Sequence, residues 1–488
     1  MDLKPHPRDH PPADLDTHEF DVLVVGAGST GENVASRAGA AGLSVAVIES
    51  ELVGGECSYW ACMPSKALLR SPEAVAAARS VDGARQAVTG SVDVAAVLQR
   101  RDGFASGWDD GGQVSWAEGQ GLALVRGAAR LTGERAVEVR GPDGSQVTLT
   151  ARHAVALCTG SEAALPPIDG LAEAEPWTAR AATSAQRVPD HLLVVGGGVV
   201  GVEMATAWSA LGSRVTVLEM ADRLLSGNEA EAGRRVQAAL VERGVDVRLT
   251  VEVTRVRREG GTVTVELGDG SSVTGSEILV ATGRRPRTGD LGLEQLGLSA
   301  SDYLQTDDSM TVQGVDGNWL YAAGDCTGRA LLTHMGKYQA RVCGDVIAAR
   351  AGGNQLHTAA WSKHAATADH AALPQVAFTD PQVASVGPTE AAAKDAGTNV
   401  DSVEFEIGDI AGAALFADDA AGWAKLVIDA DRQVLVGATF VGPQAGELLH
   451  AATIAVVGEV PLSRLWHAVP SYPTISEVWL RLLETYGL

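Results

Sequence analysis

The chain has 488 residues, of which 45% are apolar and 20% are charged, and its formal net charge is −23. This composition excludes disorder over the whole chain, and at about 150 residues per domain the length predicts roughly three domains. An acidic surface repels phosphate backbones and anionic lipids, so nucleic acids and membranes are poor partners. Five cysteines in so long a chain do not form a secreted disulfide scaffold.

Residues 1–19 are expected to form a flexible tail. They are polar and proline-rich and lack the apolar centre of a secretory signal peptide. We therefore predict a cytoplasmic protein, in which a disulfide is more often catalytic than structural.

A strand, a glycine turn, a helix and a second strand are predicted from residue 20 onward. The apolar run 20–25 leads to Gly26, Gly28 and Gly31 in the pattern GxGxxG, and alanines at helical spacing follow over residues 32–41. A second apolar run ends at Glu49. Such glycines let backbone N–H groups approach a pyrophosphate at a helix N-terminus, and the acid accepts hydrogen bonds from a ribose.

Two cysteines follow in the segment GGECSYWACMPSK, residues 54–66. A helix from Ser58 would place Cys57 near its N-terminus, where the helix dipole lowers a thiol pKa, and Pro64 would kink that helix. Cys57 and Cys62 could meet only across a distorted turn, so we expect a strained, easily reduced disulfide; two unlinked buried cysteines are the alternative. Zinc would need two further ligands, and none stands at matching spacing.

The strand–turn–helix pattern returns from residue 191. Gly196, Gly198 and Gly201 form the second turn, and the next apolar run ends at Glu219. In both copies 23 residues separate the first glycine from the acid. One GxGxxG is a weak signal, but two in the same context favour two dinucleotide sites over two tight turns without a ligand.

Alternating strand patterns fill residues 137–150 and 245–273, and each leads to a Thr-Gly pair. From about residue 373, strand patterns over 423–428 and 434–441 mix with helical patterns over 445–457 and 474–486, without a glycine fingerprint. The sequence therefore predicts two related nucleotide-binding domains followed by an interface domain.

Together these features resemble the FAD-dependent pyridine nucleotide-disulfide oxidoreductases, among them lipoamide dehydrogenase, glutathione reductase, mercuric reductase and soluble transhydrogenase. The resemblance covers residues from about 20 to 488 and rests on GGECSYWACMPSK, the paired fingerprints, ATGRRP, YAAGDCTG, FTDPQVASVG and YPTISE. It implies an α/β fold with two Rossmann-like domains, for FAD (20–160 and 284–355) and NAD(P) (161–283), plus a C-terminal α+β dimerisation domain (365–488).

The resemblance also implies residue roles. Cys62 would face the flavin as a thiolate, and Cys57 would exchange with substrate. Lys66, paired with Glu203, would lie beside flavin N5. The residues implied to bind FAD are Gly26, Gly28, Gly31, Glu49, Lys66, Gly127, Thr159, Gly160 and Asp325, and those implied to bind the nicotinamide dinucleotide are Gly196, Gly198, Gly201 and Glu219. Gly55 and Gly283 are also implied to bind a cofactor.

Glu219 favours NAD over NADP, because a carboxylate accepts from a ribose 2′-OH and repels a 2′-phosphate. NADP stays possible, since Arg223 is close in sequence and Arg284, Arg285 and Arg287 could lie near the same site.

One position departs from the family's disulfide reductases, in which His-Pro-Thr-x-x-x-Glu supplies a base from the second subunit. Here Tyr472 precedes Pro473, while Glu477 is retained and His467 is out of register. A tyrosine, with a pKa near 10, is a poor base at neutral pH but a workable hydrogen-bond donor. The family's mercuric reductases and transhydrogenases also carry tyrosine, but this chain lacks a C-terminal cysteine pair and keeps Cys62.

We therefore predict a homodimeric flavoenzyme that passes electrons from NADH through FAD to a Cys57–Cys62 disulfide. From there they reach a small acceptor, which could be a disulfide, a quinone or a metal ion. Tyr472 and Glu477 of the partner chain would shape the acceptor pocket. The alternatives are direct reduction of quinones or of NADP by the flavin, a mercuric reductase-like enzyme and, as a non-enzyme, an FAD-binding redox sensor. No resident metal is predicted. Cys158, Cys326 and Cys343 are interpreted as packing residues, with approach to the flavin as the alternative for Cys326.

Overall fold

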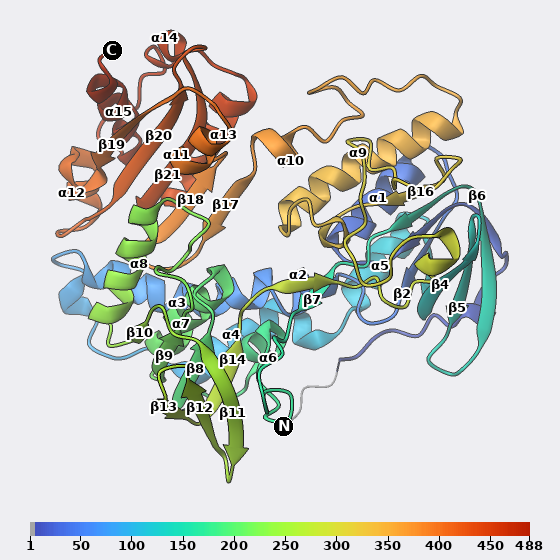
Figure 1. Cartoon of the computed structure of the whole chain (residues 1–488), viewed down its shortest axis with the longest axis horizontal. Coiled ribbons are helices and arrows are strands. Elements are labelled where there is room, and N and C mark those ends of the chain that lie inside the picture. Colours follow the sequence, from blue (N-terminus) through green and yellow to red (C-terminus); the bar gives the residue numbers. More distant parts are fainter. Residues whose placement is uncertain (1–4) are drawn as a thin grey trace. The chain divides into compact units, whose positions relative to one another are not determined.

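The computed structural model describes residues 5–488, which form two compact units (Figure 1). Unit 1 comprises the chain up to Pro64 together with Asp102–Ala164 and Gly283–Asp369. Unit 2 comprises Ser65–Arg101, Leu165–Thr282 and His370–Leu488. No helix among the described residues is both long enough and apolar enough to cross a membrane.

A largely parallel sheet forms the centre of unit 1. Its strand order is β3-β2-β1-β6-β5-β4, with β16 paired to β6, and β1 runs parallel to both β2 and β6. Every residue of β2 is buried, as expected for a parallel sheet covered on both faces. The bounds are β1 Glu19–Val25, β2 Val45–Glu49, β3 Ala123–Arg126, β4 Ala128–Gly133, β5 Ala136–Arg140, β6 Gln146–Leu157 and β16 Leu320–Ala322.

Helices α1 (Ser29–Ala40) and α9 (Thr333–Ala351) lie side by side in unit 1 (Figure 1). Their shared core includes Val34 of α1 and Val346 of α9. Near the start of both helices, a Cβ added to Gly336 of α9 would overlap the Thr30 hydroxyl of α1. This close approach joins the glycine turn to the beginning of α9. Unit 1 also holds α2 Gly55–Tyr59 and α5 Gly111–Gly119, and β7 (Ser161–Ala163) pairs with β15 (Arg284–Pro286).

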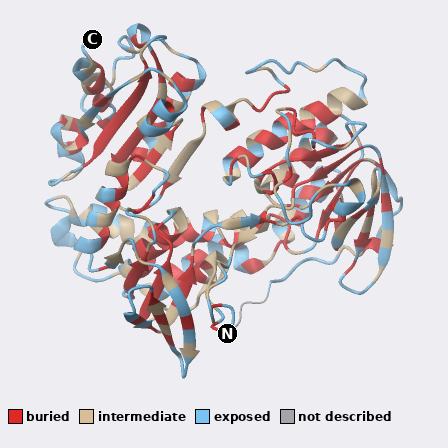
Figure 2. Cartoon of the chain, viewed as in Figure 1, coloured by how far each residue is buried: buried red, intermediate tan, exposed pale blue. Residues whose placement is uncertain are grey.

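Unit 2 contains a second parallel sheet, in the order β10-β9-β8-β14, beside a three-stranded antiparallel sheet. All five residues of β8 are buried, and Figure 2 shows this sheet as buried strands. The bounds are β8 His191–Val195, β9 Arg214–Leu218, β10 Asp246–Arg248, β14 Glu277–Val280, β11 Val253–Glu259, β12 Thr262–Leu267 and β13 Ser272–Gly275, with helices α6 Ala179–Ser184, α7 Val199–Ala210 and α8 Ala230–Glu242. The chain passes between the two units within α3 (Cys62–Arg79) and within α4 (Val94–Phe104).

The C-terminal part of unit 2 is a five-stranded antiparallel sheet, in the order β17-β18-β21-β20-β19. Helices α13 and α15 pack against it. The bounds are β17 Pro374–Ala377, β18 Gln382–Val386, β19 Val400–Glu406, β20 Trp423–Asp429, β21 Val434–Gly442, α10 Ala368–Ala371, α11 Glu390–Asp395, α12 Ala411–Phe416, α13 Ala445–Val457, α14 Leu462–Leu465 and α15 Val478–Tyr486.

The two parallel sheets repeat one arrangement. In each, the glycine turn leaves a central strand, β1 or β8, that is flanked by the strand ending in the acid and by the strand leading to the Thr-Gly pair. The predicted α/β class, with two Rossmann-like halves and a C-terminal α+β part, is confirmed.

The N-terminal segment, expected to be a flexible tail, makes ordered contacts where the structure describes it; residues 1–4 lie outside the described part. The His6 N–H donates to the Trp108 carbonyl at 2.9 Å, and the Arg126 N–H donates to the His10 carbonyl at 2.7 Å. Residues 6–10 therefore run along unit 1. The segment is rich in proline and charged residues, so it has no apolar pattern from which this contact could be predicted.

Candidate active site

The two glycine turns share one backbone geometry. Gly26 and Gly196 have φ of +98° and +107°, a region that side chains disfavour. A Cβ on Gly31 would overlap the Gly26 carbonyl oxygen, and a Cβ on Gly201 would overlap the Gly196 carbonyl oxygen in the same way. Each turn therefore requires glycine at its first and last positions.

Helices α1 and α7 begin directly after these turns. Their N-cap residues are Gly28 and Gly198, and no side chain caps either helix. A Cβ on Gly55 would lie 2.8 Å from the Gly28 Cα, so two backbones approach each other closely at the start of α1. The first N–H groups of both helices are therefore suited to an incoming phosphate.

The carboxylate of Glu49 organises the first turn. Its oxygens accept backbone N–H bonds from Ala27 and Glu51, both at 2.7 Å. Burial raises the pKa of Glu49, while these hydrogen bonds act in the opposite direction. Each carboxylate oxygen can still accept another donor, such as a ribose hydroxyl.

Glu219 organises the second turn in the same manner, accepting from Gly197 N–H and, at 2.6 Å, from Ala221 N–H. The guanidinium of nearby Arg223 pairs with Asp222 at 3.2 Å. The two N–H groups therefore hold the Glu219 carboxylate at the end of its strand, next to the second glycine turn.

Asp325 stands at the centre of a polar cluster in unit 1. Ser161 Oγ donates to its carboxylate at 2.5 Å, and Arg284 Nε lies 3.8 Å from it. Burial raises the pKa of Asp325. Thr159 and Gly160 directly precede Ser161 in the chain. The sequence-predicted cofactor residues that fall in unit 1 are Gly26, Gly28, Gly31, Glu49, Gly55, Gly127, Thr159, Gly160, Gly283 and Asp325.

Cys57 and Cys62 come together at a break between two helices. Cys57 lies inside α2 and Cys62 is the first residue of α3. Both are thiols here, hydrogen-bonded to each other, and Cys62 Sγ lies 3.2 Å from Thr333 Oγ1 at the start of α9. The prediction of one helix kinked at Pro64 is wrong: Pro64 is the third residue of α3, in a first turn that needs no N–H from it.

The pKa of Cys57 also departs from the sequence-based expectation. Its hydrogen bond to Cys62, and then burial, raise the pKa well above the usual thiol value, while Thr333 and Lys337 act in the opposite direction. The Cys62 contact and burial therefore move the pKa of Cys57 in the direction opposite to the predicted lowering by a helix dipole. Cys57 needs a group that takes its proton before it can act as a nucleophile.

Lys66 and Glu203 form an ion pair within unit 2. Lys66 Nζ donates to Glu203 Oε2 at 2.8 Å, and the other Glu203 oxygen accepts from the Phe378 N–H at 2.9 Å. The ammonium also lies 4.9 Å from the centre of the Phe378 ring. Lys66 follows Cys62 in α3, and the chain passes from unit 1 to unit 2 between these two residues.

Comparison with known proteins agrees with these features. Residues 20–353 match the pyridine nucleotide-disulphide oxidoreductase family, and residues 373–482 match that family's dimerisation domain. The chain belongs to this family. It is an oxidoreductase, and the family's cofactors are FAD and NAD(H).

Relatives within the family differ in activity. The chain is 33% identical over 470 residues to dihydrolipoyl dehydrogenase 3 of Pseudomonas aeruginosa, covering 94% of this chain and 96% of that protein. It is 29% identical over 471 residues to a mercuric reductase of Staphylococcus aureus, covering 94% and 81%. The flavoprotein disulfide reductase RclA of Escherichia coli, in a Cu(II) complex, shares the fold with a TM-score of 0.82 at 22% identity, covering 96% and 99%.

The residues of unit 1 fit FAD, the family's flavin. The uncapped start of α1 suits a pyrophosphate, Glu49 retains lone pairs for ribose hydroxyls, and the buried Asp325 carboxylate is available to a polyol chain. The matching geometry in unit 2 fits the second dinucleotide.

The arginines considered for an NADP phosphate do not lie on the unit that carries Glu219. Arg284, Arg285 and Arg287 belong to unit 1, where Arg285 bonds to Glu162 at 2.8 Å and Arg287 pairs with Glu51 at 3.1 Å. Their place beside the nicotinamide dinucleotide stays a prediction.

Tyr472 and Glu477 lie in very different surroundings in unit 2. Tyr472 is 76% exposed, whereas Glu477 is buried and accepts from Arg481 at 2.6 Å. Among the described residues, no hydrogen bond links the tyrosine to the glutamate.

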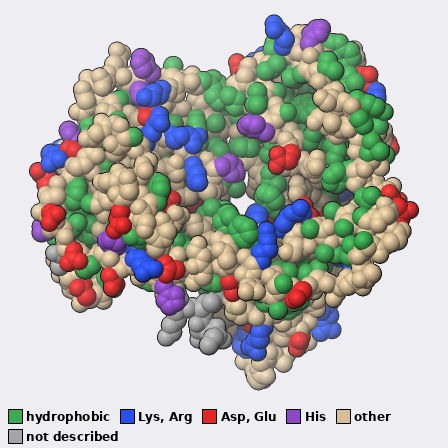
Figure 3. Space-filling view, turned by 180° about the vertical axis from the view of Figure 1, so that it is seen from behind, with side chains coloured by type: hydrophobic (Ala, Val, Ile, Leu, Met, Phe, Trp, Pro, Cys, Tyr) green, Lys and Arg blue, Asp and Glu red, His purple; other side chains and the backbone are tan. Residues whose placement is uncertain are grey.

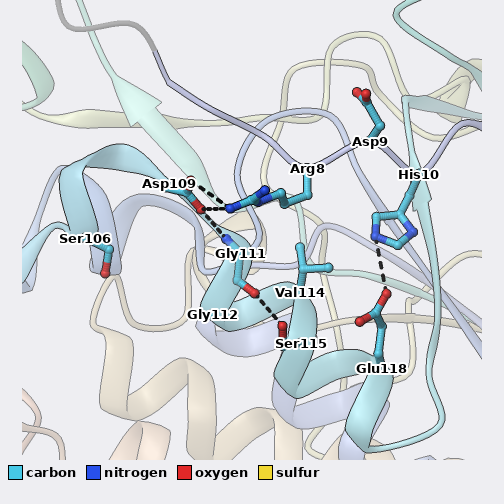
Figure 4. A pocket seen from close by; sticks show the side chains of 10 residues that line it. All are labelled: Arg8, Asp9, His10, Ser106, Asp109, Gly111, Gly112, Val114, Ser115 and Glu118. Atoms are coloured by element: carbon cyan, nitrogen blue, oxygen red, sulfur yellow. Dashed lines mark hydrogen bonds and ion pairs between the residues drawn. The ribbon is translucent and has the colours of Figure 1, made fainter.

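A separate cavity of about 620 Å³ lies at the start of α5 and contains none of the predicted site residues (Figure 4). It is lined by Arg8, His10, Asp109 and Glu118, among others. Over residues 5–488, no group of three or more histidine, cysteine or acidic side chains could hold a metal ion. On the face shown in Figure 3, acidic side chains lie in several separate places.

Sequence reasoning missed three residues of the site: Ser161, Thr333 and Phe378. Ser161 directly follows the predicted Thr-Gly pair, so its neighbours offered a signal. Thr333 and Phe378 reach the site only through tertiary packing of α9 and of the segment before β18, and no local pattern marks them.

Proposed function

We propose that this chain is an NADH-dependent disulfide reductase in which Cys57 and Cys62 carry the electrons to a small disulfide. The observation that carries the proposal is the contact between the two thiols at the α2–α3 break, with Cys62 against Thr333. When bound, FAD supplies two-electron transfer between a nicotinamide and sulfur.

The chain's own residues then perform thiol–disulfide exchange. The Cys57 thiolate attacks one sulfur of the acceptor disulfide and releases the first product thiolate. The Cys62 thiolate next attacks Cys57 in the mixed disulfide, which releases the second thiolate and closes the Cys57–Cys62 bond. The Lys66–Glu203 pair holds α3 and keeps a positive charge one turn beyond Cys62.

A second candidate function is direct reduction of a quinone or of NADP by the flavin. The exposed Tyr472 favours it, because this position supplies no base for a thiol. The acceptor pocket, in our proposal, is completed by Tyr472 and Glu477 of a second copy, which is supported by the matching dimerisation domain. A reducing cytoplasmic location suits a site of free thiols.

The proposal is tested by anaerobic titration of the purified yellow protein with NADH. We expect a long-wavelength absorption band from a thiolate beside oxidised flavin, followed by reoxidation on adding a small disulfide. Reoxidation by quinone but not by any disulfide would instead support the second candidate. Hg(II) serves as a third acceptor in the same series.

The choice of nicotinamide depends on Glu219. Replacing Glu219 with alanine is expected to raise the KM for NADH about tenfold, because a charged hydrogen bond of roughly 1.5 kcal/mol is lost. The same change should reduce the preference for NADH over NADPH, because the carboxylate no longer repels a 2′-phosphate. Steady-state kinetics with both nucleotides measure this, and an unchanged preference would contradict the assignment.

A further inference from the structure

A short N-terminal arm, residues 6–10, lies before the part of the chain that matches the family. The arm is mostly exposed, and its main chain bonds to unit 1. Two ion pairs, Arg8–Asp109 at 3.2 Å and His10–Glu118 at 3.6 Å, also join it to the region of α5 (Figure 4). Exposed pairs of this kind add little to stability. The attachment therefore depends mainly on the hydrogen bonds of the main chain.

The arm lies against a buried ion pair. Arg126 ends β3 and Asp110 directly precedes α5; their side chains are 4% and 0% exposed and lie 2.7 Å apart. The Arg8 N–H donates to Asp110 Oδ1 at 2.9 Å, and the Arg8 carbonyl accepts from Arg126 Nε at 3.2 Å. The His10 carbonyl accepts the Arg126 N–H at 2.7 Å. The arm thus supplies partners for polar groups that are costly to bury without them.

The same ion pair holds the loop that follows Glu49. Arg126 Nη1 donates to the Glu51 carbonyl at 2.6 Å, and Asp110 Oδ2 accepts from the Val53 N–H at 3.0 Å. The Glu51 N–H in turn donates to the Glu49 carboxylate at 2.7 Å. The ion pair therefore connects the arm, through direct hydrogen bonds, to the carboxylate that suits a ribose of FAD.

The other end of this loop reaches the first glycine turn. The Gly54 N–H donates to the Ala27 carbonyl at 2.8 Å, and Gly54 is the N-cap of α2. Leu52 and Val53 are each only 1% exposed. A loop packed this closely passes a displacement on to its neighbours. A change in residues 51–53 should therefore alter both the turn and the Glu49 carboxylate.

We propose that the arm stabilises the FAD-binding form of residues 51–53 by completing the Arg126–Asp110 pair. These two are positioning residues, which act on FAD through the loop and Glu49. Without the arm, water can replace its main-chain groups, so the chain should still fold. The pair would then lie in a more polar environment and hold the loop less firmly. The inference rests on the assignment of the first turn to FAD, whatever the electron acceptor is.

The test compares the unchanged holoenzyme with a variant that lacks residues 1–10. After dilution, free flavin is separated by rapid gel filtration at intervals and quantified by its absorbance, a readout that needs no turnover. We expect FAD release to be about tenfold faster without the arm, the effect of losing one hydrogen bond to a charged group. The NADH concentration that half-bleaches the flavin should not change, because Glu219 lies in unit 2. Equal release rates would overturn the inference.

Amide hydrogen exchange shows where the arm acts. In the shortened protein, the amides of residues 51–55 should exchange faster, while those of β6 should exchange as before. Faster exchange in β6 as well would indicate a general loss of stability and would contradict a specific effect on the loop. Faster flavin release with unchanged exchange over residues 51–55 would contradict the proposed route in the same way.

Two variants of the full-length chain keep the test decisive should the shortened protein fold poorly. Arg8→Pro removes the N–H that reaches Asp110 and retains the carbonyl, so FAD release should be about threefold faster. Asp9→Ala changes the adjacent exposed side chain, which makes none of the hydrogen bonds described above, and should match the unchanged protein. Coincident release from these two variants would overturn the inference. Failure of the unchanged enzyme to reduce any disulfide would overturn the proposed function and leave the flavin-release result standing.

Discussion

Replacing Cys57 with serine is expected to end disulfide reduction while NADH still bleaches the bound flavin. A serine hydroxyl can neither form nor exchange a disulfide, so turnover through the pair should fall by about 10³-fold or more. The groups suited to the dinucleotides, at the two glycine turns and at Glu49 and Glu219, are untouched by the change. Stopped-flow absorbance of the flavin and steady-state release of product thiol measure the two half-reactions separately.

Cys343→Ala is the matched control for this experiment. Cys343 is a buried thiol on α9, and it packs with apolar side chains. Its removal should leave disulfide reduction close to that of the unchanged enzyme. If Cys57→Ser lost activity toward disulfides and kept full activity toward quinones, the flavin would reduce quinones directly, and only disulfide reduction would require the cysteine pair.

The spacing of the glycines and of the acids that follow them predicted most of the fold. GxGxxG fixes a turn through backbone sterics that are local, and the acid 23 residues later fixes the neighbouring strand, so Gly26 to Glu49 and Gly196 to Glu219 predicted both parallel sheets. The break between α2 and α3 was not predictable in the same way. Pro64 could either kink a helix or lie in the first turn of one. Only the structure, in which a new helix begins at Cys62 and brings it against Cys57, distinguishes these outcomes.

The electrostatic part of the site was the least accessible from sequence. The start of α9 lies about 270 residues beyond Cys62 in the chain, so nothing local indicated that Thr333 would lie against Cys62.

Replacing Gly201 with alanine is expected to abolish reduction by NADH while the protein remains yellow. The added Cβ would overlap the Gly196 carbonyl oxygen, so the turn must open or α7 must shift. Overpacking of this kind costs up to about 3 kcal/mol of stability. Because the turn that would bind the pyrophosphate must distort to relieve it, we expect NADH binding to weaken by up to roughly 10²-fold. The equivalent glycine of the other turn, Gly31, lies in unit 1 and is unchanged, so FAD should be retained. Flavin absorbance of the purified protein and the NADH dependence of bleaching measure the two effects.

Gly227→Ala provides the control within the same unit. A Cβ at Gly227 would meet no atom within 4 Å, and the residue's φ is not in the left-handed region. This variant should therefore bind NADH as the unchanged enzyme does. If Gly201→Ala instead lost its flavin and kept its nucleotide affinity, the assignment of the two turns to the two cofactors would be reversed. The two turns are nearly identical in backbone geometry, so the fold alone does not say which cofactor each turn binds. The flavin content and NADH affinity of these variants make that assignment.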